Sequence, residues 1–294
     1  MKKILLTGGT GFIGRNIKEK LGKKYDILSP ISKNLDLSDK KSVDLYIKKN
    51  NITDIIHCAV YNQKRRDIDV NADLSSNLHM FYNLAECAET LEGKMLYFGS
   101  GAEYDKRKPV HMAQEKNLGM RIPNLNDYSL SKHIMNLSAR RSKNIYNLRL
   151  FGIFGKYENW CTCFISNLCC KAIYDLPLTV RQECVFDFMY IDDLIPVVEW
   201  FLENIPKYHD YNICTGKPVK LTQIAVLIKK ISGSSGEIKL LSDGMNMEYT
   251  GSNRRIEQEL AVKFSDREKA IQSLYYYYKK NFDENDLRIL KDTR

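Results

Sequence analysis

The sequence predicts an α/β protein in which a doubly wound parallel sheet carries a second, smaller α/β lobe. In the first half of the chain, short apolar runs alternate with longer amphipathic segments, as strands and crossover helices do in a parallel sheet. A glycine-rich turn directly follows the first apolar run. The length of 294 residues suits one large domain or two lobes that share a core.

The first half supplies strands and helices in alternation. The apolar runs expected as strands cover residues 3–7, 25–28, 54–58, 95–99 and 146–150. The segments with helical spacing of apolar residues are 11–21, 40–50, 74–90 and 128–143. Asp39 and Asp127 stand near the starts of two of these helices, where a carboxylate can accept from free backbone N–H groups. We therefore expect residues 1–150 to form the sheet domain.

The alternation weakens after residue 150. Helical spacing returns over 165–174, 192–204 and 221–231, and a strand is expected over 211–214. Residues 232–236 predict a turn, and a charged helix from Asp266 contains four consecutive tyrosines, which suit packing and surface better than a ligand site. We expect residues 151–294 to form a smaller substrate-binding lobe over the carboxyl edge of the sheet, with returns to the sheet near 189–214.

Composition excludes a disordered chain, because 44% of the residues are hydrophobic. The 45 Lys and Arg residues against 36 Asp and Glu residues give a net charge of +9, which suits either nucleic acid or an anionic small molecule. No nucleic-acid motif accompanies the charge, so we expect no nucleic-acid partner. The N-terminal apolar stretch is too short for a signal peptide, and no apolar run approaches the roughly 20 residues of a membrane span. A cytoplasmic protein without membrane contact is expected.

The eight cysteines are expected to be reduced thiols that mostly pack as small hydrophobic groups. Four of them lie close together in the chain, at positions 161, 163, 169 and 170. No C-x-x-C pair occurs, and zinc sites usually need paired ligands at such spacing. No metal is therefore expected.

The glycine-rich turn has the geometry of a phosphate-binding loop. Gly8, Gly11 and Gly14 follow the first strand at three-residue spacing and lead into a helix. Glycine lets the backbone approach a pyrophosphate, whose charge is stabilised by the N–H groups and dipole of the helix N-terminus. The position between the first strand and the first helix makes a chance match improbable.

Tyr128 and Lys132 form a second motif, Y-x-x-x-K, on the last helix of the first half. Four residues place the phenol and the ammonium on one helix face, one turn apart. Because a free tyrosine has a pKa of about 10, proton transfer near neutral pH needs a nearby cation that favours phenolate. Lys132 can supply that charge, although an exposed i,i+4 pair on an ordinary helix is the alternative for this motif alone.

These motifs resemble the short-chain dehydrogenase/reductase superfamily, in particular its extended branch of sugar-nucleotide epimerases, dehydratases and reductases with a Rossmann domain. A third motif, Ser100-Gly-Ala-Glu-Tyr104, is similar to the S-x-x-x-Y segment of that branch. The resemblance implies that Ser100 hydrogen-bonds the reacting oxygen, that Tyr128 exchanges the proton, and that Lys132 also binds the nicotinamide ribose. The overall pattern is most similar to that of the fucose-nucleotide synthase-like 4-ketoreductases. This similarity includes residues 155–160.

The resemblance also implies a set of cofactor-binding residues. The segment from His57 to Val60 matches the small-residue segment that lies against the cofactor, and Asp36 with Leu37 matches the pair at the adenine ring. The full set is Gly8, Thr10, Gly11, Phe12, Ile13, Gly14, Arg15, Lys33, Asp36, Leu37, Cys58, Ala59, Val60, Asn77, Tyr128 and Lys132.

Departures from the family narrow the reaction. The 4,6-dehydratases carry two acid/base carboxylates directly after the catalytic Ser or Thr, where this chain has Gly101 and Ala102; Glu103 comes one place too late and is expected to face the other way. The cysteine and histidine with which fucose-nucleotide enzymes epimerise match Ala102 and approximately Cys163. Reduction of a ketone, or a C4 epimerisation through a ketone, remains.

Cofactor choice separates these two reactions. No acid stands at the end of the second strand to accept from a ribose 2′-OH, whereas Arg15, Ser32 and Lys33 are available for a 2′-phosphate. This favours NADP(H), with NAD(H) as the alternative. On the substrate side, Gly152 and Phe186 replace an asparagine and an arginine of the family, and Arg181, Arg254 and Arg255 are candidates for the diphosphate.

The sequence therefore predicts an NADP(H)-dependent reductase of a 4-keto-6-deoxy sugar nucleotide. A C4 epimerase with NAD is the alternative, and a non-catalytic binding protein is disfavoured because Tyr128 and Lys132 are both present. The expected partner is a nucleotide sugar. A homodimer is also expected from the resemblance, with the helices over 74–90 and 128–143 as the candidate interface.

Overall fold

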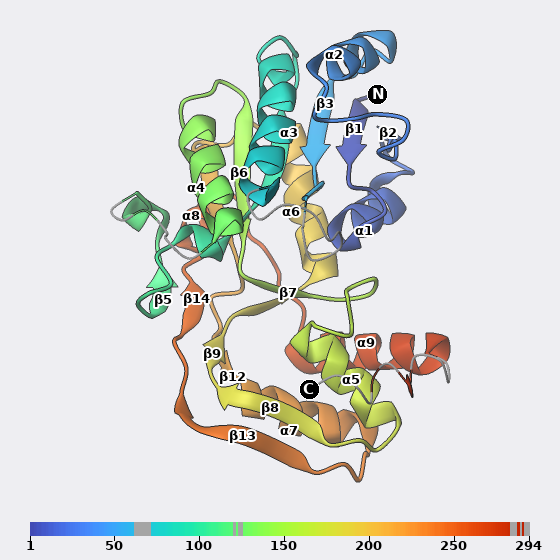
Figure 1. Ribbon diagram of the computed structural model, residues 1–294, viewed down its shortest axis with the longest axis vertical. Helices are drawn as coiled ribbons and strands as arrows, with labels where there is room; N and C mark the ends of the chain where they lie inside the picture. Colours follow the sequence, from blue (N-terminus) through green and yellow to red (C-terminus); the bar gives the residue numbers. More distant parts are fainter. Residues whose placement is uncertain (62–71, 120–121, 123–125, 283–286, 289, 291–294) are drawn as a thin grey trace.

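A six-stranded parallel sheet forms one half of the molecule (Figure 1). This computed structural model describes residues 1–61, 72–119, 122, 126–282, 287–288 and 290. The strand order is β11-β6-β4-β3-β1-β2. These strands are β1 (Lys3–Thr7), β2 (Asp26–Leu28), β3 (Asp54–His57), β4 (Met95–Ser100), β6 (Ile145–Leu150) and β11 (Asp210–Ile213). The predicted fold class is confirmed, and the five strands expected from the first half are all present.

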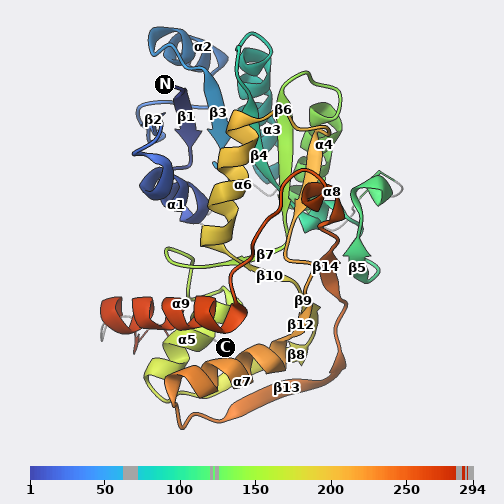
Figure 2. The same cartoon turned by 180° about the vertical axis from the view of Figure 1, so that it is seen from behind.

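Helices cover both faces of this sheet (Figures 1 and 2). One face packs against α1 (Phe12–Leu21) and α6 (Ile191–Glu203), and the other against α2 (Lys40–Lys49), α3 (Ala72–Ala88) and α4 (Asp127–Ala139). Alternate residues of a strand serve the two cores: Ile4 belongs to the first and Leu5 to the second, and both are fully buried. Asp39 caps α2 by accepting from the Lys41 backbone, as predicted, whereas α4 is capped by Asn126, one residue before Asp127.

The strand order reverses at β1, which pairs with β2 on one side and β3 on the other. In open α/β sheets, ligands bind beyond the carboxyl ends of the strands at such a switch point. Those carboxyl ends face the second lobe (Figure 1). The fold thus places the glycine-rich turn at the entrance to the space between the sheet and that lobe.

The second lobe has its own apolar core. It contains the parallel strands β8 (Leu178–Glu183) and β13 (Ile238–Met245), with α5 (Phe164–Ile173), α7 (Leu221–Ser232) and α9 (Arg267–Asn281) (Figure 1). Gly233 ends α7 with a positive φ of 70°, in the predicted turn. The tyrosine run on α9 divides as expected: Tyr275 and Tyr278 are buried in this core, whereas Tyr276 is exposed.

Short strands connect the two halves, and the sequence did not predict them. A four-stranded sheet has the order β12-β9-β14-β5, from β12 (Val219–Lys220), β9 (Val185–Phe186), β14 (Tyr249–Gly251) and β5 (Val110–Ala113). A further pair joins β7 (Gly152–Phe154) to β10 (Phe188–Tyr190). The 3-10 turns η2 (Gly101–Glu103) and η3 (Glu115–Asn117) and the short helix α8 (Arg254–Glu257) complete the described elements. Strands of two to four residues are too short to show an alternation of apolar and polar positions.

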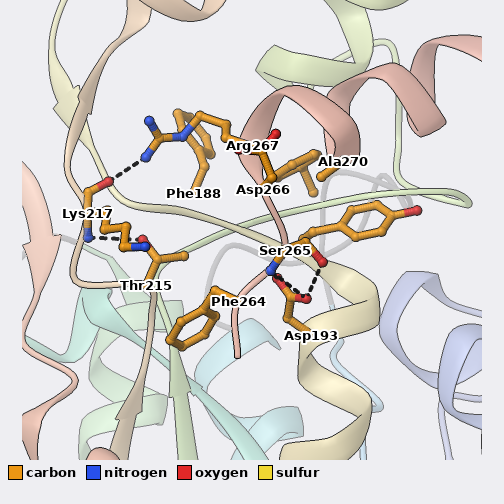
Figure 3. A pocket seen from close by; sticks show the side chains of 11 residues that line it. Phe188, Asp193, Thr215, Lys217, Phe264, Ser265, Asp266, Arg267 and Ala270 are labelled. Atoms are coloured by element: carbon orange, nitrogen blue, oxygen red, sulfur yellow. Dashed lines mark hydrogen bonds between the residues drawn. The ribbon is translucent and has the colours of Figure 1, made fainter. Parts of the chain in front are cut away.

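A polar contact holds the segment before α9 against α6 (Figure 3). The backbone N–H and hydroxyl of Ser265 both donate to the carboxylate of Asp193, the N–H at 3.0 Å from Oδ2. Nearby, Arg267 donates to the carbonyl of Lys217. These groups line a cavity of about 360 Å³, and the hydrogen bonds from Ser265 give Asp193 a structural role.

All eight cysteines lie among the described residues, and none of them forms a disulfide bond. Within the described ranges, no group of three or more His, Cys, Asp and Glu side chains is placed to hold a metal ion. No helix among the described residues is long and apolar enough to span a bilayer.

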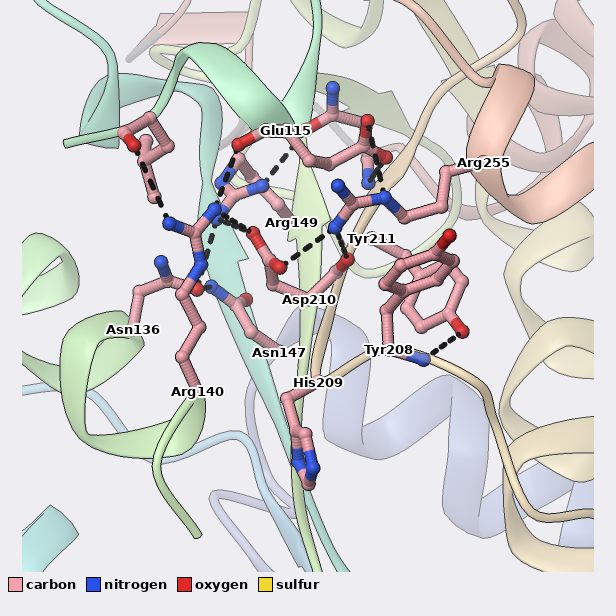
Figure 4. A network of polar contacts seen from close by, with 12 residues as sticks. Glu115, Asn136, Arg140, Asn147, Arg149, Tyr208, His209, Asp210, Tyr211 and Arg255 are labelled. Carbon is pink, nitrogen blue, oxygen red and sulfur yellow. Dashed lines mark hydrogen bonds and ion pairs between the residues drawn. The ribbon is translucent and has the colours of Figure 1, made fainter. Parts of the chain in front are cut away.

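A buried ionic network lies under the sheet ends that face the short strands (Figure 4). Its centre is Arg149 on β6, which is fully buried and donates from Nε to Glu103 at 2.8 Å and from Nη2 to Asp210 at 3.1 Å. Arg140 and Arg255 bind the same Asp210 carboxylate at 2.8 and 2.9 Å. The two carboxylates of the network hold Arg149 in its charged form, and its pKa is well above the usual range although burial alone would lower it. The network thus ties β4, β6, β11 and α8 together.

Arg149→Met tests the importance of this buried charge. Removing one partner of a buried ion pair leaves the other uncompensated, so we expect a loss of about 3–5 kcal/mol in the free energy of unfolding. Urea unfolding measures it. The matched control is Arg107→Met, which removes an exposed ion pair to Asp105 and should change stability far less. Equal effects of the two substitutions would contradict a special role for Arg149.

Candidate active site

The glycine turn is built so that side chains cannot be added. Gly8 has a φ of +68°, and a Cβ there would lie 2.6 Å from the backbone nitrogen of Ala59. A Cβ on Gly14 would lie 2.4 Å from the carbonyl oxygen of Gly8, because α1 packs directly on the turn. Gly11 is the N-cap of α1 and offers no side-chain cap. This close-packed turn at a helix N-terminus fits a dinucleotide pyrophosphate.

Beside the turn, a cavity of about 530 Å³ lies at the end of β2. Of the predicted cofactor residues, Gly8, Thr10, Asp36, Leu37, Ala59 and Val60 line it. Asp36 also accepts from the backbone and hydroxyl of Ser38, so its carboxylate is partly engaged within its own loop. The cavity has the place and size for the adenosine half of a dinucleotide.

The three residues proposed for a 2′-phosphate are not brought together. Ser32 lines the cavity, but Lys33 is exposed and does not. The guanidinium of Arg15 lies 3.8 Å from the centre of the Tyr157 ring, in a cation–π contact. The structure therefore provides one of the three expected groups at this cavity.

A second, narrower cavity of about 160 Å³ contains the predicted catalytic residues. Ser100, Tyr128 and Lys132 line it together, although they come from β4 and α4. Ile13, Cys58 and Val60 of the predicted cofactor set complete the wall toward the first cavity, and Val60 lines both. A dinucleotide can thus extend from the first cavity into the second.

Burial controls the protonation of the catalytic pair. The ammonium of Lys132 donates to the carbonyl of Phe98 at 2.8 Å, and burial lowers its pKa to about 8. Burial raises the pKa of Tyr128, and a hydrogen bond with Ser100 offsets part of the rise. The expected stabilisation of phenolate by Lys132 is therefore not the dominant effect here, and Tyr128 is held as a neutral phenol, the form that can donate a proton.

Two polar residues near the cavity have structural roles. His57 shares a 2.8 Å hydrogen bond with the hydroxyl of Thr7, and burial lowers its pKa to about 3, so the ring is neutral. The Asn77 amide binds both the backbone N–H and the carbonyl of Tyr61, at 2.9 and 3.0 Å. Asn77 thus positions the cofactor-facing segment that ends at Tyr61.

A third cavity of about 640 Å³ opens between residues 106–110 and the second lobe. We call it the substrate cavity. Arg181, one of the three arginines named from the sequence as candidates for the diphosphate, lines it. Lys106 and Lys108 line it as well and were missed, although the basic run 106–108 begins two residues after the S-x-x-x-Y segment ends at Tyr104. Phe186 and Tyr249 form part of its wall. The cavity combines cationic and aromatic groups, which suits a nucleotide diphosphate.

Residues 4–214 match the model of the NAD dependent epimerase/dehydratase family. The chain belongs to this family. It is 27% identical over 256 residues to a GDP-L-colitose synthase of Yersinia pseudotuberculosis, in an alignment covering 80% of this chain and 83% of the relative. The predicted resemblance is thus confirmed, and the chain is a member of a family of NAD(P)-dependent sugar-nucleotide epimerases and reductases.

Solved structures share the fold over nearly the whole chain. A GDP-L-fucose synthetase from Naegleria fowleri bound to NADP superposes with a TM-score of 0.83 at 19% identity, covering 96% of this chain and 95% of that one. A GDP-mannoheptose C4 reductase from Campylobacter jejuni with NADP bound gives 0.79 at 18% identity, covering 95% and 98%. Both similarities include the second lobe.

The residues directly after Ser100 bring no acid to the small cavity. Gly101 and Ala102 form the turn η2 and bring no acid to the cavity. Glu103 faces away, as predicted: it is fully buried, accepts from the Ser100 backbone at 3.0 Å, and pairs with Arg149. Cys163 lies at the start of α5, where it hydrogen-bonds Glu158. None of these residues supplies an acid or base to the small cavity.

Two of the candidate substrate arginines lie elsewhere. Arg255 is engaged in the buried network, where its Nη1 atom donates to Asp210 at 2.9 Å. Arg254 is exposed on α8 and does not line the substrate cavity. The structure thus places the Arg255 guanidinium in the buried network and not at the cavity that Arg181 lines. Sequence spacing could not separate it from its exposed neighbour.

Gly8→Ala tests whether the turn holds the dinucleotide. The added methyl group would meet the Ala59 backbone in a conformation that disfavours side chains, so NADPH binding should weaken about tenfold or more. Calorimetric titration measures it. Gly233→Ala is the matched control, because Gly233 has a similar φ of +70° but open space around its Cβ position. Unchanged affinity in Gly8→Ala would exclude the turn as the binding site.

Proposed function

We propose that this protein is an NADP(H)-dependent reductase of a 4-keto-6-deoxy sugar nucleotide. The observation that carries the proposal is the small cavity in which Ser100, a neutral Tyr128 and Lys132 meet, next to a turn whose one acid, Glu103, pairs with Arg149 and does not line the cavity. Elimination of water and epimerisation beside a ketone both need such additional acid/base groups. Reduction needs only a proton donor and a way to hold the ketone.

Each catalytic residue has a distinct task in this proposal. The bound cofactor would supply a hydride to the ketone carbon. Ser100 hydrogen-bonds the ketone oxygen and so stabilises the negative charge that develops on it. Tyr128 transfers its phenolic proton to that oxygen, and the nearby Lys132 charge stabilises the phenolate left behind. Lys132 also holds the ribose, while Lys106, Lys108 and Arg181 bind the substrate diphosphate.

An NAD-dependent C4 epimerase is the second candidate. It is favoured by the placement of Arg15 against Tyr157 and of Lys33 outside the adenosine cavity, which leaves few groups for a 2′-phosphate. The same catalytic residues would serve this reaction. The two candidates differ in whether the cofactor is consumed.

A homodimer is a further part of the proposal. Tyr82 on α3 and Leu137 on α4 are large apolar side chains that remain exposed, at 37% and 41%. The Tyr82 hydroxyl shares a 2.8 Å hydrogen bond with Ser138, so the two helices present one continuous surface. This surface is the proposed contact between two copies.

Turnover with NADPH tests the proposed function. The protein is incubated with NADPH or NADH and a panel of 4-keto sugar nucleotides, and we expect NADPH oxidation with at least one member. Tyr128→Phe should lower kcat by about a thousandfold while leaving NADPH affinity nearly unchanged, because it removes only the proton donor. Copurified NAD, with interconversion of two sugar nucleotides and no net oxidation, would identify the epimerase instead.

The pH dependence tests the charge of Lys132. Lys132 has a pKa of about 8 in the free enzyme, so its side chain is charged below that pH and loses its charge as the pH rises through 8. We expect kcat/KM for NADPH, which reports the free enzyme, to fall by about tenfold per pH unit above this value. Tyr128 stays protonated there because its pKa is raised. A profile that is flat well above pH 8 would contradict the assignment.

A further inference from the structure

Tyr249 brings a second phenol, in addition to that of Tyr128, to the hydroxyl of Ser100. It lies on β14, which pairs with β5 and β9 in the sheet that joins the two lobes. Its hydroxyl oxygen is 3.4 Å from Oγ of Ser100. The side chain is buried, and it lines the substrate cavity, whereas Ser100 lines the small catalytic cavity. Tyr249 therefore stands at the wall between the two cavities.

Gly101 makes this approach possible. A Cβ at Gly101 would lie 2.6 Å from the Tyr249 hydroxyl oxygen and 2.7 Å from the ring of Phe151. A residue with any side chain there would displace the phenol or the ring. Gly101 thus has two consequences: no carboxylate directly follows Ser100, and the Tyr249 phenol can lie beside Ser100.

The count of hydrogen-bonding groups assigns the direction of this contact. The Ser100 hydroxyl has one hydrogen and two lone pairs, and Oγ already accepts from the backbone N–H of Ala102 at 3.1 Å. Among the described residues, Ser100 is the sole hydrogen-bond partner of the Tyr249 hydroxyl. If Tyr249 accepted from Ser100, its own buried hydrogen would have no acceptor there, at the cost of an unsatisfied group. Donation by Tyr249 satisfies it and fills the second lone pair of Ser100.

The orientation of the Ser100 hydrogen follows. With Ala102 and Tyr249 donating into both lone pairs, the single hydrogen can point only away from them, toward Tyr128 and the space for the ketone. Donation into Oγ also makes the Ser100 hydroxyl a stronger donor, because hydrogen bonds in a chain polarise one another. The distance of 3.4 Å exceeds the usual length of about 2.8 Å, as catalytic hydrogen bonds often do before substrate binds.

We propose that Tyr249 is a positioning residue for the reaction, which directs and polarises the Ser100 hydroxyl by donating to it. The proposal rests on the proposed function for its kinetic consequence, since Ser100 is the group that would hold the ketone oxygen. It assigns the second lobe a part in catalysis. The strand that borders the substrate cavity also completes the hydrogen bonding of the catalytic serine.

Tyr249→Phe removes only the hydroxyl and leaves the ring that packs on Phe151 and Phe186. We expect kcat to fall about tenfold with little change in the KM for NADPH, the size expected for one lost hydrogen bond. Tyr104→Phe is the matched control: Tyr104 belongs to the same apolar cluster and loses a buried hydrogen bond to Asn212. The control should change kcat by less than about twofold. Equal losses in both variants would indicate a structural role and overturn the proposal.

A double-mutant cycle tests whether Tyr249 acts through Ser100. In a Ser100→Ala background, Tyr249→Phe should have no further effect on kcat, because the hydroxyl that it directs is gone. A full additional tenfold loss would show that Tyr249 acts independently of Ser100 and would overturn the proposal. The cycle is measured in whichever reaction the wild-type protein shows, reduction or epimerisation, because both use Ser100.

An alkaline absorbance titration decides the matter if the wild-type protein turns over no member of the panel, which would refute only the proposed function. The Tyr128 transition is isolated by comparing each protein with its Tyr128→Phe counterpart. Without Tyr249 as donor, Ser100 stabilises the Tyr128 phenolate less well, so the transition should move up by about half a pH unit in Tyr249→Phe. It should not move in Tyr104→Phe. An unmoved transition in Tyr249→Phe, or the same movement in both, would overturn the proposal.

Discussion

The buried ion pair between Glu103 and Arg149 is the constraint on which the catalytic end of the sheet depends. Both side chains are fully buried, so each needs the other to be charged away from water. Glu103 also accepts from the backbone nitrogen of Ser100, and Arg149 reaches Asp210 on the neighbouring strand. One charge pair therefore fixes the spacing of β4, β6 and β11 and the direction in which the chain leaves β4. That direction leaves the Ser100 side chain at the small catalytic cavity.

Burial acts in opposite senses on the two members of the Y-x-x-x-K motif. It raises the pKa of Tyr128, because phenolate is disfavoured away from water, and it lowers the pKa of Lys132, because ammonium is disfavoured as well. The same small cavity thus keeps the Tyr128 phenol protonated and lowers the pKa of Lys132 to about 8, close to neutral pH. The Lys132 ammonium keeps one strong partner, the carbonyl of Phe98 on the adjacent strand. The charge that matters for the reaction is therefore the one most easily lost as the pH rises.

The sequence could predict those parts of the fold that depend on local pattern. Alternating apolar runs predicted the five sheet strands, and helical spacing predicted that Tyr128 and Lys132 lie on one helix face. The resemblance to the family added Ser100, and these three residues line one cavity. The short joining strands could not be predicted, because two to four residues carry no periodicity. Tyr249 was missed for the same reason: only the pairing of β14 with β5 and β9 brings it to Ser100, across 149 positions of sequence. Arg255 was misplaced because its partner, Asp210, is recognisable only once β11 has joined the sheet.

Gly152 and Phe186, the two replacements on the substrate side, act together. A Cβ at Gly152 would lie 2.6 Å from the carbonyl oxygen of Asp187 and 2.8 Å from the Phe188 ring, so no side chain fits there. Phe186 stacks on that same Phe188 ring at 5.3 Å and contacts Tyr249 at the same distance. Where the family has an asparagine and an arginine, this chain therefore has a continuous aromatic surface that ends at the catalytic serine. Charge recognition is left to Lys106, Lys108 and Arg181 at the rim of the cavity. In the proposed reaction, shape and apolar contact at this wall would select the sugar that can bring its ketone to Ser100.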